Sequence, residues 1–259
     1  MSEKVLFHQE GPLGTITLNR PASLNALDND MIADILSYLH IAKKKEEIRV
    51  VRIKGEGKAF CAGDDLVDMG TKDHPNPSDK LTEYMDGYPA IVKAMRGLEK
   101  PIIAQVHKYA LGAGLEIALA ADFILASKET RFGLPFVMRG LSAGTVLLQE
   151  MVGYHQAAKY LYLGEMFTAQ EAFDWKLLHE LTESNELEDA ALHLANRLEK
   201  SATRAIGLMK TAMHASRHMD MQEAFQVQVY STFGSYHTED YKEGVQAFIE
   251  KRSPKFYGK

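Results

Sequence analysis

Short apolar runs alternate with amphipathic stretches through the first half of this chain. Several runs have the period of two or the β-branched content that predicts strands, at 15–19, 50–53, 102–106 and 122–126. Other stretches carry apolar residues three and four positions apart and predict helices, at 28–46, 79–98 and 115–121. Because strands and helices alternate, the pattern indicates an α/β protein rather than an all-β fold or a helical bundle.

After Gly140 the pattern becomes helical and is expected to stay so. Amphipathic stretches cover 146–152, 156–163, 169–175, 187–199, 202–215, 221–233 and 239–251. We therefore expect an α/β core over residues 1–200 and a helical segment over 201–259. That segment is too small to bury a core of its own, so we expect it to pack on the core or on another subunit.

Composition and charge restrict the partners of such a protein. The chain has 259 residues, of which 46% are hydrophobic, so it can bury one large core. Its net charge of −5 provides no basic field, and we expect no nucleic-acid partner. A small anionic ligand is not excluded, because it needs only local N–H groups and a few cations. No apolar run is long enough to span a membrane and no secretory signal pattern is visible, so we expect neither.

Cysteine and histidine usage argues against a disulfide or a metal site. Cys61 is the only cysteine, which excludes an intrachain disulfide and fits a reducing compartment, so we expect a cytoplasmic protein. No histidine lies near Cys61 in sequence, and an inert packing role is favoured over a nucleophile. His214 and His218 have a spacing that suits chelation, but they lie on a Lys/Arg-bearing helix face typical of a solvated surface.

A turn of small residues, Gly112-Ala113-Gly114, follows a predicted strand and opens an apolar helix. Glycine allows another group to approach the backbone closely. The first N–H groups of a helix lack intrahelical partners and carry the positive end of its dipole. The turn therefore predicts a site for an anion, or for the oxyanion that develops during a reaction.

Glu116 is the only residue between Lys108 and Asp122 whose side chain can carry a charge near neutral pH. A carboxyl group in apolar surroundings has a raised pKa, which suits proton transfer near neutral pH. The alternative is a first-turn glutamate that only stabilises the helix dipole, by about 0.3–1 kcal/mol. This stretch alone does not separate the two hypotheses.

A second stretch of small residues, 58–66, follows the predicted strand 50–53. Its sequence is Lys-Ala-Phe-Cys-Ala-Gly-Asp-Asp-Leu, and its small side chains would again leave backbone N–H groups accessible. An ordinary surface turn after a strand explains the same composition. Taken alone, the stretch leaves both interpretations open.

Taken together, the two stretches resemble the crotonase (enoyl-CoA hydratase/isomerase) family. The first matches the family pattern Lys-x-Phe-Cys/Ala-Ala-Gly-x-Asp-Leu over 58–66. The second matches Ala-x-Gly-Gly/Ala-Gly-x-Glu-Leu/Ile-Ala-x-x-x-Asp over 110–122. Flanking matches lie at 19–27, 100–104 and 238–252, so the resemblance spans nearly the whole chain. Each motif is moderately specific, and their order and spacing together are strongly so.

The resemblance implies a fold and a substrate. The fold would be a crotonase-like spiral of β-β-α units with a C-terminal helical trimerisation segment, assembled as a homotrimer or homohexamer. The substrate would be an acyl-CoA thioester, with no metal and no cofactor besides the CoA that it carries. The amides of Ala62 and Ala113 would form the oxyanion hole, at about 3 kcal/mol for each donor, and Glu116 would move the proton.

The resemblance also implies which residues surround the substrate. Those that bind CoA would be Lys58, Ala62, Gly63, Asp64, Asp65, Leu66, Phe248 and Lys251, with Arg20 and Leu24 as weaker candidates. The last two, Phe248 and Lys251, would reach the adenine end of CoA across a subunit boundary. Gly112, Phe136 and Leu141 would line the acyl pocket.

The chain departs from the family pattern at Phe136, which stands where hydratases have their second glutamate. The following segment, 140–145, departs as well, and the pocket wall there is expected to be more apolar. Three hypotheses remain. The first is a hydratase acting reversibly on 2-enoyl-CoA through Glu116 alone or with another acid, for which Glu83 and Asp86 are candidates. The second is a single-base isomerase or decarboxylase, and the third is a non-catalytic acyl-CoA binder.

A nucleotide-binding oxidoreductase is the competing class. Gly112 and Gly114 after a strand resemble half of a dinucleotide-binding fingerprint, but position 117 is Ile where the third glycine would stand. Half a motif in the middle of the chain is weak support. Retention on immobilised CoA without binding of a nicotinamide cofactor would separate the two classes.

Overall fold

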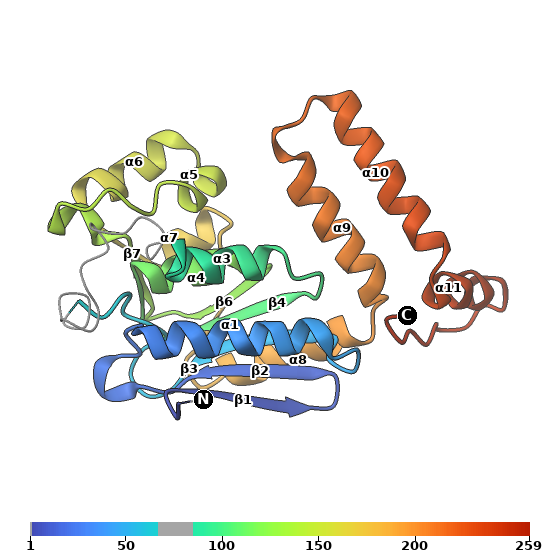
Figure 1. The fold of residues 1–259 in the computed structure, drawn as a ribbon, viewed down its shortest axis with the longest axis horizontal. Helices are drawn as coiled ribbons and strands as arrows, with labels where there is room; N and C mark the ends of the chain where they lie inside the picture. Colours follow the sequence, from blue (N-terminus) through green and yellow to red (C-terminus); the bar gives the residue numbers. More distant parts are fainter. Residues whose placement is uncertain (1, 67–84) are drawn as a thin grey trace.

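The computed structural model describes residues 2–66 and 85–259, and its centre is a large twisted sheet (Figure 1). The described strands of this sheet run in the order β1-β2-β3-β4-β6-β9, with β1 antiparallel to β2 and every other pair parallel. They are β1 (Val5–Glu10), β2 (Leu13–Leu18), β3 (Val50–Gly55), β4 (Ile102–Val106), β6 (Phe123–Ser127) and β9 (Glu180–Thr182). The mixed α/β class predicted from the pattern is therefore present.

Helices cover both faces of the large sheet. One face packs against α1 (Asn29–Lys44), α3 (Tyr88–Arg96) and α4 (Ala113–Ala120), and the other against α8 (Leu187–Glu199). Neighbouring strand residues divide between the two apolar clusters: Ile102 faces the first and Ile103 the second, and both are fully buried. Burial on both faces explains why these strands read as continuous apolar runs in the sequence.

A second, smaller sheet lies beside the first and carries one of the predicted motifs. Its strands are β5 (Tyr109–Leu111), β7 (Arg131–Gly133) and β8 (Met166–Thr168), in the order β5-β7-β8. The purely helical pattern expected after Gly140 is wrong at β8 and β9. Both strands are three residues long, which is too short to show a period of two.

The predicted helices are otherwise present within a few residues of their expected ends. Asp28 caps α1 by accepting a hydrogen bond from the Met31 amide at 2.9 Å. Of the helix expected over 79–98, α3 forms the C-terminal part and ends at Arg96, with Gly97 as its cap; residues 79–84 lie outside the described residues. The remaining elements are α5 (Leu147–Val152), α6 (Tyr154–Leu163), α7 (Ala169–Asp174), α9 (Thr203–Ala215), α10 (Met221–Tyr236), α11 (Glu239–Ile249) and the 3₁₀ turns η1 (Pro21–Ser23), η4 (Pro135–Arg139) and η5 (Ser216–His218).

Helices α9 and α10 form a hairpin that extends away from the sheet, and α11 follows α10 at the open end of the hairpin, beside the C-terminus (Figure 1). Ion pairs connect the hairpin to the body: Lys210 binds Asp122 at 2.7 Å, and Arg217 binds Glu150. Along α10, the apolar side chains one helical turn apart are mostly exposed: Met221, Phe225, Val229 and Phe233. None of the helices in the described ranges is long and apolar enough to cross a membrane.

Candidate active site

The two small-residue stretches meet in space. The Cys61 amide donates to the Tyr109 carbonyl oxygen at 3.1 Å, and the Leu111 amide donates to the Cys61 carbonyl oxygen at 3.0 Å. A Cβ atom placed on Gly114 would lie 2.5 Å from the Cys61 oxygen, so only glycine fits there. Gly63 has φ +102°, and a Cβ atom on it would lie 3.6 Å from the Ala113 nitrogen. The predicted convergence of two separate loops is therefore present.

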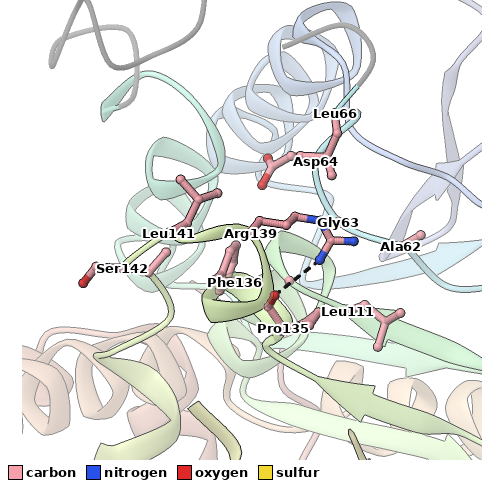
Figure 2. A pocket seen from close by; sticks show the side chains of 12 residues that line it. Ala62, Gly63, Asp64, Leu66, Leu111, Pro135, Phe136, Arg139, Leu141 and Ser142 are labelled. Atoms are coloured by element: carbon pink, nitrogen blue, oxygen red, sulfur yellow. Dashed lines mark hydrogen bonds between the residues drawn. The ribbon is translucent and has the colours of Figure 1, made fainter. Parts of the chain in front are cut away.

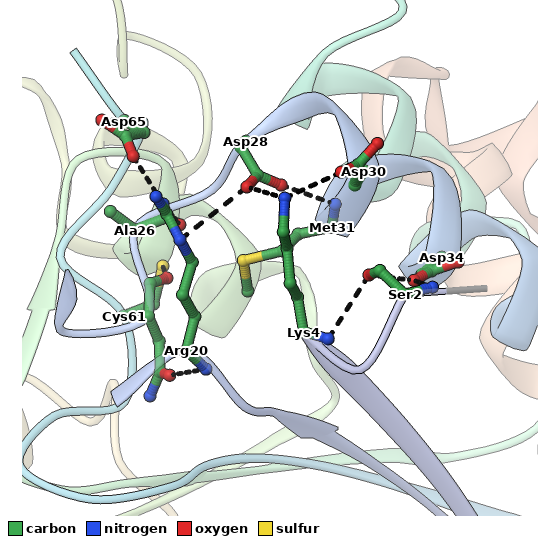
Figure 3. A network of polar contacts seen from close by, with 11 residues as sticks. Ser2, Lys4, Arg20, Ala26, Asp28, Asp30, Met31, Asp34, Cys61 and Asp65 are labelled. Atoms are coloured by element: carbon green, nitrogen blue, oxygen red, sulfur yellow. Dashed lines mark hydrogen bonds and ion pairs between the residues drawn. The ribbon is translucent and has the colours of Figure 1, made fainter. Parts of the chain in front are cut away.

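A polar network holds the first loop in place (Figure 3). The Leu27 amide donates to the Gly63 oxygen at 2.8 Å, and the Asp65 amide donates to the Leu27 oxygen at 2.9 Å. Arg20 binds the Asp65 carboxylate at 2.5 Å and lies 3.8 Å from Asp28. The Asp65 side chain thus belongs to this network, and it does not line the pocket described below.

Asn25 has a structural role that the sequence analysis did not identify. It is fully buried with φ +57°. Its side-chain amide donates to the carbonyl oxygens of Glu56, Ala59 and Phe60 at 2.9, 2.8 and 3.2 Å. One asparagine therefore satisfies several carbonyls at the start of the loop and fixes its position.

The backbone amides correct one predicted role. The Ala62 amide donates to the Leu24 oxygen at 3.0 Å, so it is already engaged and cannot serve as a free donor to a substrate carbonyl. Within the described ranges, no backbone carbonyl accepts from the amides of Gly63 or Asp64, or from that of Ala113 at the start of α4. The donors available where the loops meet are therefore Ala113 and the residues that follow Ala62.

A pocket of about 170 Å³ opens at this junction (Figure 2). The predicted residues that line it are Ala62, Gly63, Asp64, Leu66, Gly112, Phe136 and Leu141. Others that sequence reasoning missed are Leu111, Pro135, Arg139, Ser142 and Ala143. Most of these follow β7, in the segment where the chain departs from the family pattern, so no motif pointed to them.

Phe136 forms an apolar part of the pocket wall. Its ring lies 6.4 Å from that of Tyr88, centroid to centroid, and the planes are nearly parallel. A Cβ atom on Gly112 would lie 3.6 Å from the same ring. This part of the wall can therefore neither hold a water molecule by hydrogen bonding nor supply a proton.

Glu116 is in the first turn of α4, one helical turn after Gly112, and it is not among the residues that line this pocket. Its side chain is 5% exposed, and its Oε1 atom has no hydrogen-bond partner in the part of the chain that the structure describes. Burial raises the pKa of this carboxyl to about 7, and the positive charge of Arg96 partly opposes the shift. Arg96 is held nearby by a 2.7 Å hydrogen bond to the Leu119 oxygen. The raised pKa expected from the sequence is confirmed.

Several predicted CoA contacts lie away from this pocket. Lys58 is exposed and borders a different depression, together with Lys54 and Lys108. Phe248 is 85% exposed and Lys251 is also exposed, at the end of α11. Figure 1 places α11 at the opposite end of the molecule from β7. A single chain therefore does not bring these two residues to the pocket, and Glu83 lies outside the described residues.

Comparisons with known proteins agree with this arrangement. The enoyl-CoA hydratase/isomerase family model matches residues 8–259. The chain is 32% identical to the 1,2-epoxyphenylacetyl-CoA isomerase and 34% identical to the 2,3-dehydroadipyl-CoA hydratase of Escherichia coli (strain K12). Each match covers 100% of this chain and 100% of the relative. The solved enoyl-CoA hydratase of Bacillus anthracis superposes with a TM-score of 0.91 at 27% identity, over 99% of this chain and 100% of that one.

These matches cover the sheet, the junction of the two loops and the C-terminal helices alike. The crotonase-type α/β fold expected from the motifs is thus shared with solved hydratases. The chain belongs to the enoyl-CoA hydratase/isomerase family and is an enzyme of that family.

Proposed function

We propose that this enzyme stabilises the enolate of an acyl-CoA thioester and that Glu116 transfers a proton to or from it. The observation that carries the proposal is a buried carboxyl in the same helical turn as the Ala113 amide, at the junction where two separate loops meet. The thioester oxygen would be held by the Ala113 amide and by an amide of Gly63 or Asp64, in place of Ala62. Each such donor contributes about 3 kcal/mol to transition-state stabilisation.

The reaction we propose is the reversible hydration of a 2-enoyl-CoA. The relatives named above include a hydratase and an isomerase at nearly the same identity, so identity alone does not decide between them. Phe136 in the pocket wall favours the second candidate, a single-base isomerase or decarboxylase, because hydration needs one more group that exchanges protons.

The chemistry needs no metal and no organic cofactor other than the CoA of the substrate. A lone unpaired cysteine suits a reducing compartment such as the cytoplasm.

A panel of acyl-CoA substrates tests this proposal. The purified enzyme is incubated with 2-enoyl, 3-enoyl, 3-hydroxy and malonyl-type thioesters in H₂O and D₂O. Mass spectrometry then records gain or loss of water, loss of CO₂ and exchange at the α-carbon. We expect gain of water on a 2-enoyl-CoA together with α-exchange. Exchange without hydration would assign the isomerase reaction, and binding without any exchange would leave an acyl-CoA binder.

We also propose that α10 takes part in a homotrimer or a pair of trimers. Met221, Phe225, Val229 and Phe233 form an exposed apolar stripe along this helix, and such stripes mark contacts between proteins. Assembly would also give Phe248 and Lys251 a route to the pocket of another subunit.

Charge placed on this stripe is expected to dissociate the assembly. The double variant Phe225→Asp/Val229→Asp should have the mass of a single chain by light scattering, because two buried carboxylates would cost several kcal/mol per interface. Gln226→Asp, a neighbouring exposed position, serves as the control and should leave the mass unchanged. A wild-type protein that is monomeric at micromolar concentration would contradict the proposal.

A further inference from the structure

A second carboxyl group with no role in the proposal above lines the pocket. Asp64 contributes to the wall together with Phe136 and Arg139, and Figure 2 shows its carboxylate among the lining side chains. Arg139 and Asp64 form no ion pair in the part of the chain that the structure describes, and the Arg139 guanidinium donates to the Pro135 oxygen at 3.3 Å. Across the described residues, no salt bridge or side-chain hydrogen bond neutralises this carboxyl.

The backbone explains why Asp64 faces the pocket while its neighbour does not. Asp64 pairs with Leu27 as a parallel bridge, which keeps the chain extended at this point. Successive side chains of an extended segment point to opposite sides. Asp65 points into the network with Arg20, so Asp64 must point the other way. Its position is therefore set by the same hydrogen bonds that hold the loop.

The surroundings of Asp64 suit a group that both takes up and releases protons. Burial raises the pKa of this carboxyl to about 6, although its own backbone amide partly lowers it. An acid that titrates near the working pH can exist in either form at useful populations. Asp64 also directly follows Gly63, whose backbone approaches Ala113, and Gly63, Asp64 and Gly112 line the same pocket.

We propose that Asp64 is the second proton-transferring residue of this site, alongside Glu116. The inference rests on the proposed function and deepens it, because it supplies the group that Phe136 cannot provide. In the hydration direction, the Glu116 carboxylate takes a proton from water as the water oxygen bonds to the β-carbon. The electron pair of the double bond passes into the enolate, and the Asp64 carboxyl gives its proton to the α-carbon. Proton transfer through solvent from Glu116 to Asp64 restores both groups.

The variant Asp64→Asn tests this role, because the amide has nearly the same shape and keeps the backbone amide in place. We expect hydration kcat to fall at least about 10²-fold, the usual contribution of one acid or base. The dissociation constant of a saturated acyl-CoA should change by less than about threefold. Asp174→Asn, the same change at an exposed position of α7, is the matched control and should keep wild-type rates.

The pH profile separates proton transfer from a structural effect. Wild-type kcat should rise and then fall with pH, with its maximum between the two pKa values of about 6 and about 7, because activity needs the minor form in which Glu116 is ionised and Asp64 is protonated. In Asp64→Asn the fall on the alkaline side should disappear, and the residual rate should rise to a plateau above the Glu116 pKa of about 7. An active variant with an unchanged profile would overturn the inference, and so would loss of hydration in Asp86→Asn but not in Asp64→Asn.

The two proposals fail in different ways. If the wild-type enzyme neither hydrates nor exchanges any thioester of the panel, the proposed function itself is wrong. If the wild type is active and Asp64→Asn is equally active, only the role of Asp64 is wrong. Thermal unfolding of each variant identifies any that has lost its fold, and Asp64→Glu, which keeps the acid, should then recover more hydration activity than Asp64→Asn.

Discussion

Glu116→Gln is expected to lower turnover of an acyl-CoA substrate by about 10²–10⁴-fold. Glutamine has the size of the carboxyl but cannot exchange the proton, while the amides at the loop junction remain in place. Acyl-CoA binding measured by calorimetry should therefore persist with a similar dissociation constant. Glu180→Gln changes an exposed glutamate in β9 and is the matched control, with no expected effect. Full activity of Glu116→Gln would remove this residue from the mechanism.

The same variant should be more stable than the wild type at alkaline pH. The folded-state pKa of Glu116 is about 7, above the ordinary value of 4.5, because burial disfavours the charged form. Below the unfolded-state pKa of about 4.5 the carboxyl is protonated in both states and does not destabilise the fold. As pH rises from there through 7, the folded protein becomes less stable, because the unfolded chain ionises more readily. At pH 8 the penalty approaches roughly 3 kcal/mol. Urea unfolding of both proteins at pH 5 and pH 8 measures the difference, which should grow with pH.

Gly114→Ala is expected to damage both stability and activity, although alanine normally favours a helix. A helical Gly→Ala change gains up to about 1 kcal/mol. Here the new Cβ atom would lie 2.5 Å from the Cys61 oxygen and 2.7 Å from the Cys61 Cβ atom. Backbone cannot yield as a flexible side chain does, so we expect a net loss of about 1–3 kcal/mol. Displacement of the two loops by about 1 Å would also lower kcat about 10²-fold.

Gly244→Ala provides the comparison for this prediction. Gly244 lies in α11, and a Cβ atom there would meet only the edge of the Phe256 ring at 3.5 Å, an ordinary contact. That variant should be as stable as the wild type or slightly more so. Denaturant unfolding and kcat for both variants test the pair. A Gly114→Ala enzyme with wild-type stability and rate would mean that the two loops are not in close contact.

Much of the fold was predictable because the residues that favour a helix or strand locally are also the residues that the fold buries. The Asp28 cap and the apolar stripe of α1 are visible in the sequence, as are the β-branched runs of β3 and β4. The short strands β8 and β9 were missed because three residues carry no measurable period. Strand β1 was missed as well, since Val5 is its only buried residue and the polar residues at its C-terminal half are also typical of a loop.

The site was predictable where the backbone conformation requires a particular residue, such as glycine. It was not predictable where side chains meet only through tertiary packing. Gly63 and Gly114 stand out in the sequence because the loops could not approach without them. The donor role given to Ala62 was wrong because its amide binds Leu24, a long-range contact that no spacing reveals. Arg139 reaches the pocket through η4, a turn without a recognisable pattern, and so it was not predicted.

The position of Cys61 has a consequence for the chemistry of its sulfur. The thiol is fully buried, its sulfur lies 3.1 Å from the Asn25 oxygen, and burial raises its pKa to about 12. Alkylating reagents and peroxides attack the thiolate, which is therefore both scarce and shielded in the native protein. Such a reagent reaches the sulfur only when the segments that bury it, around Asn25 and Ala110, move away from it. Because the chain has no other cysteine, the rate of labelling measures how often the junction of the two loops opens.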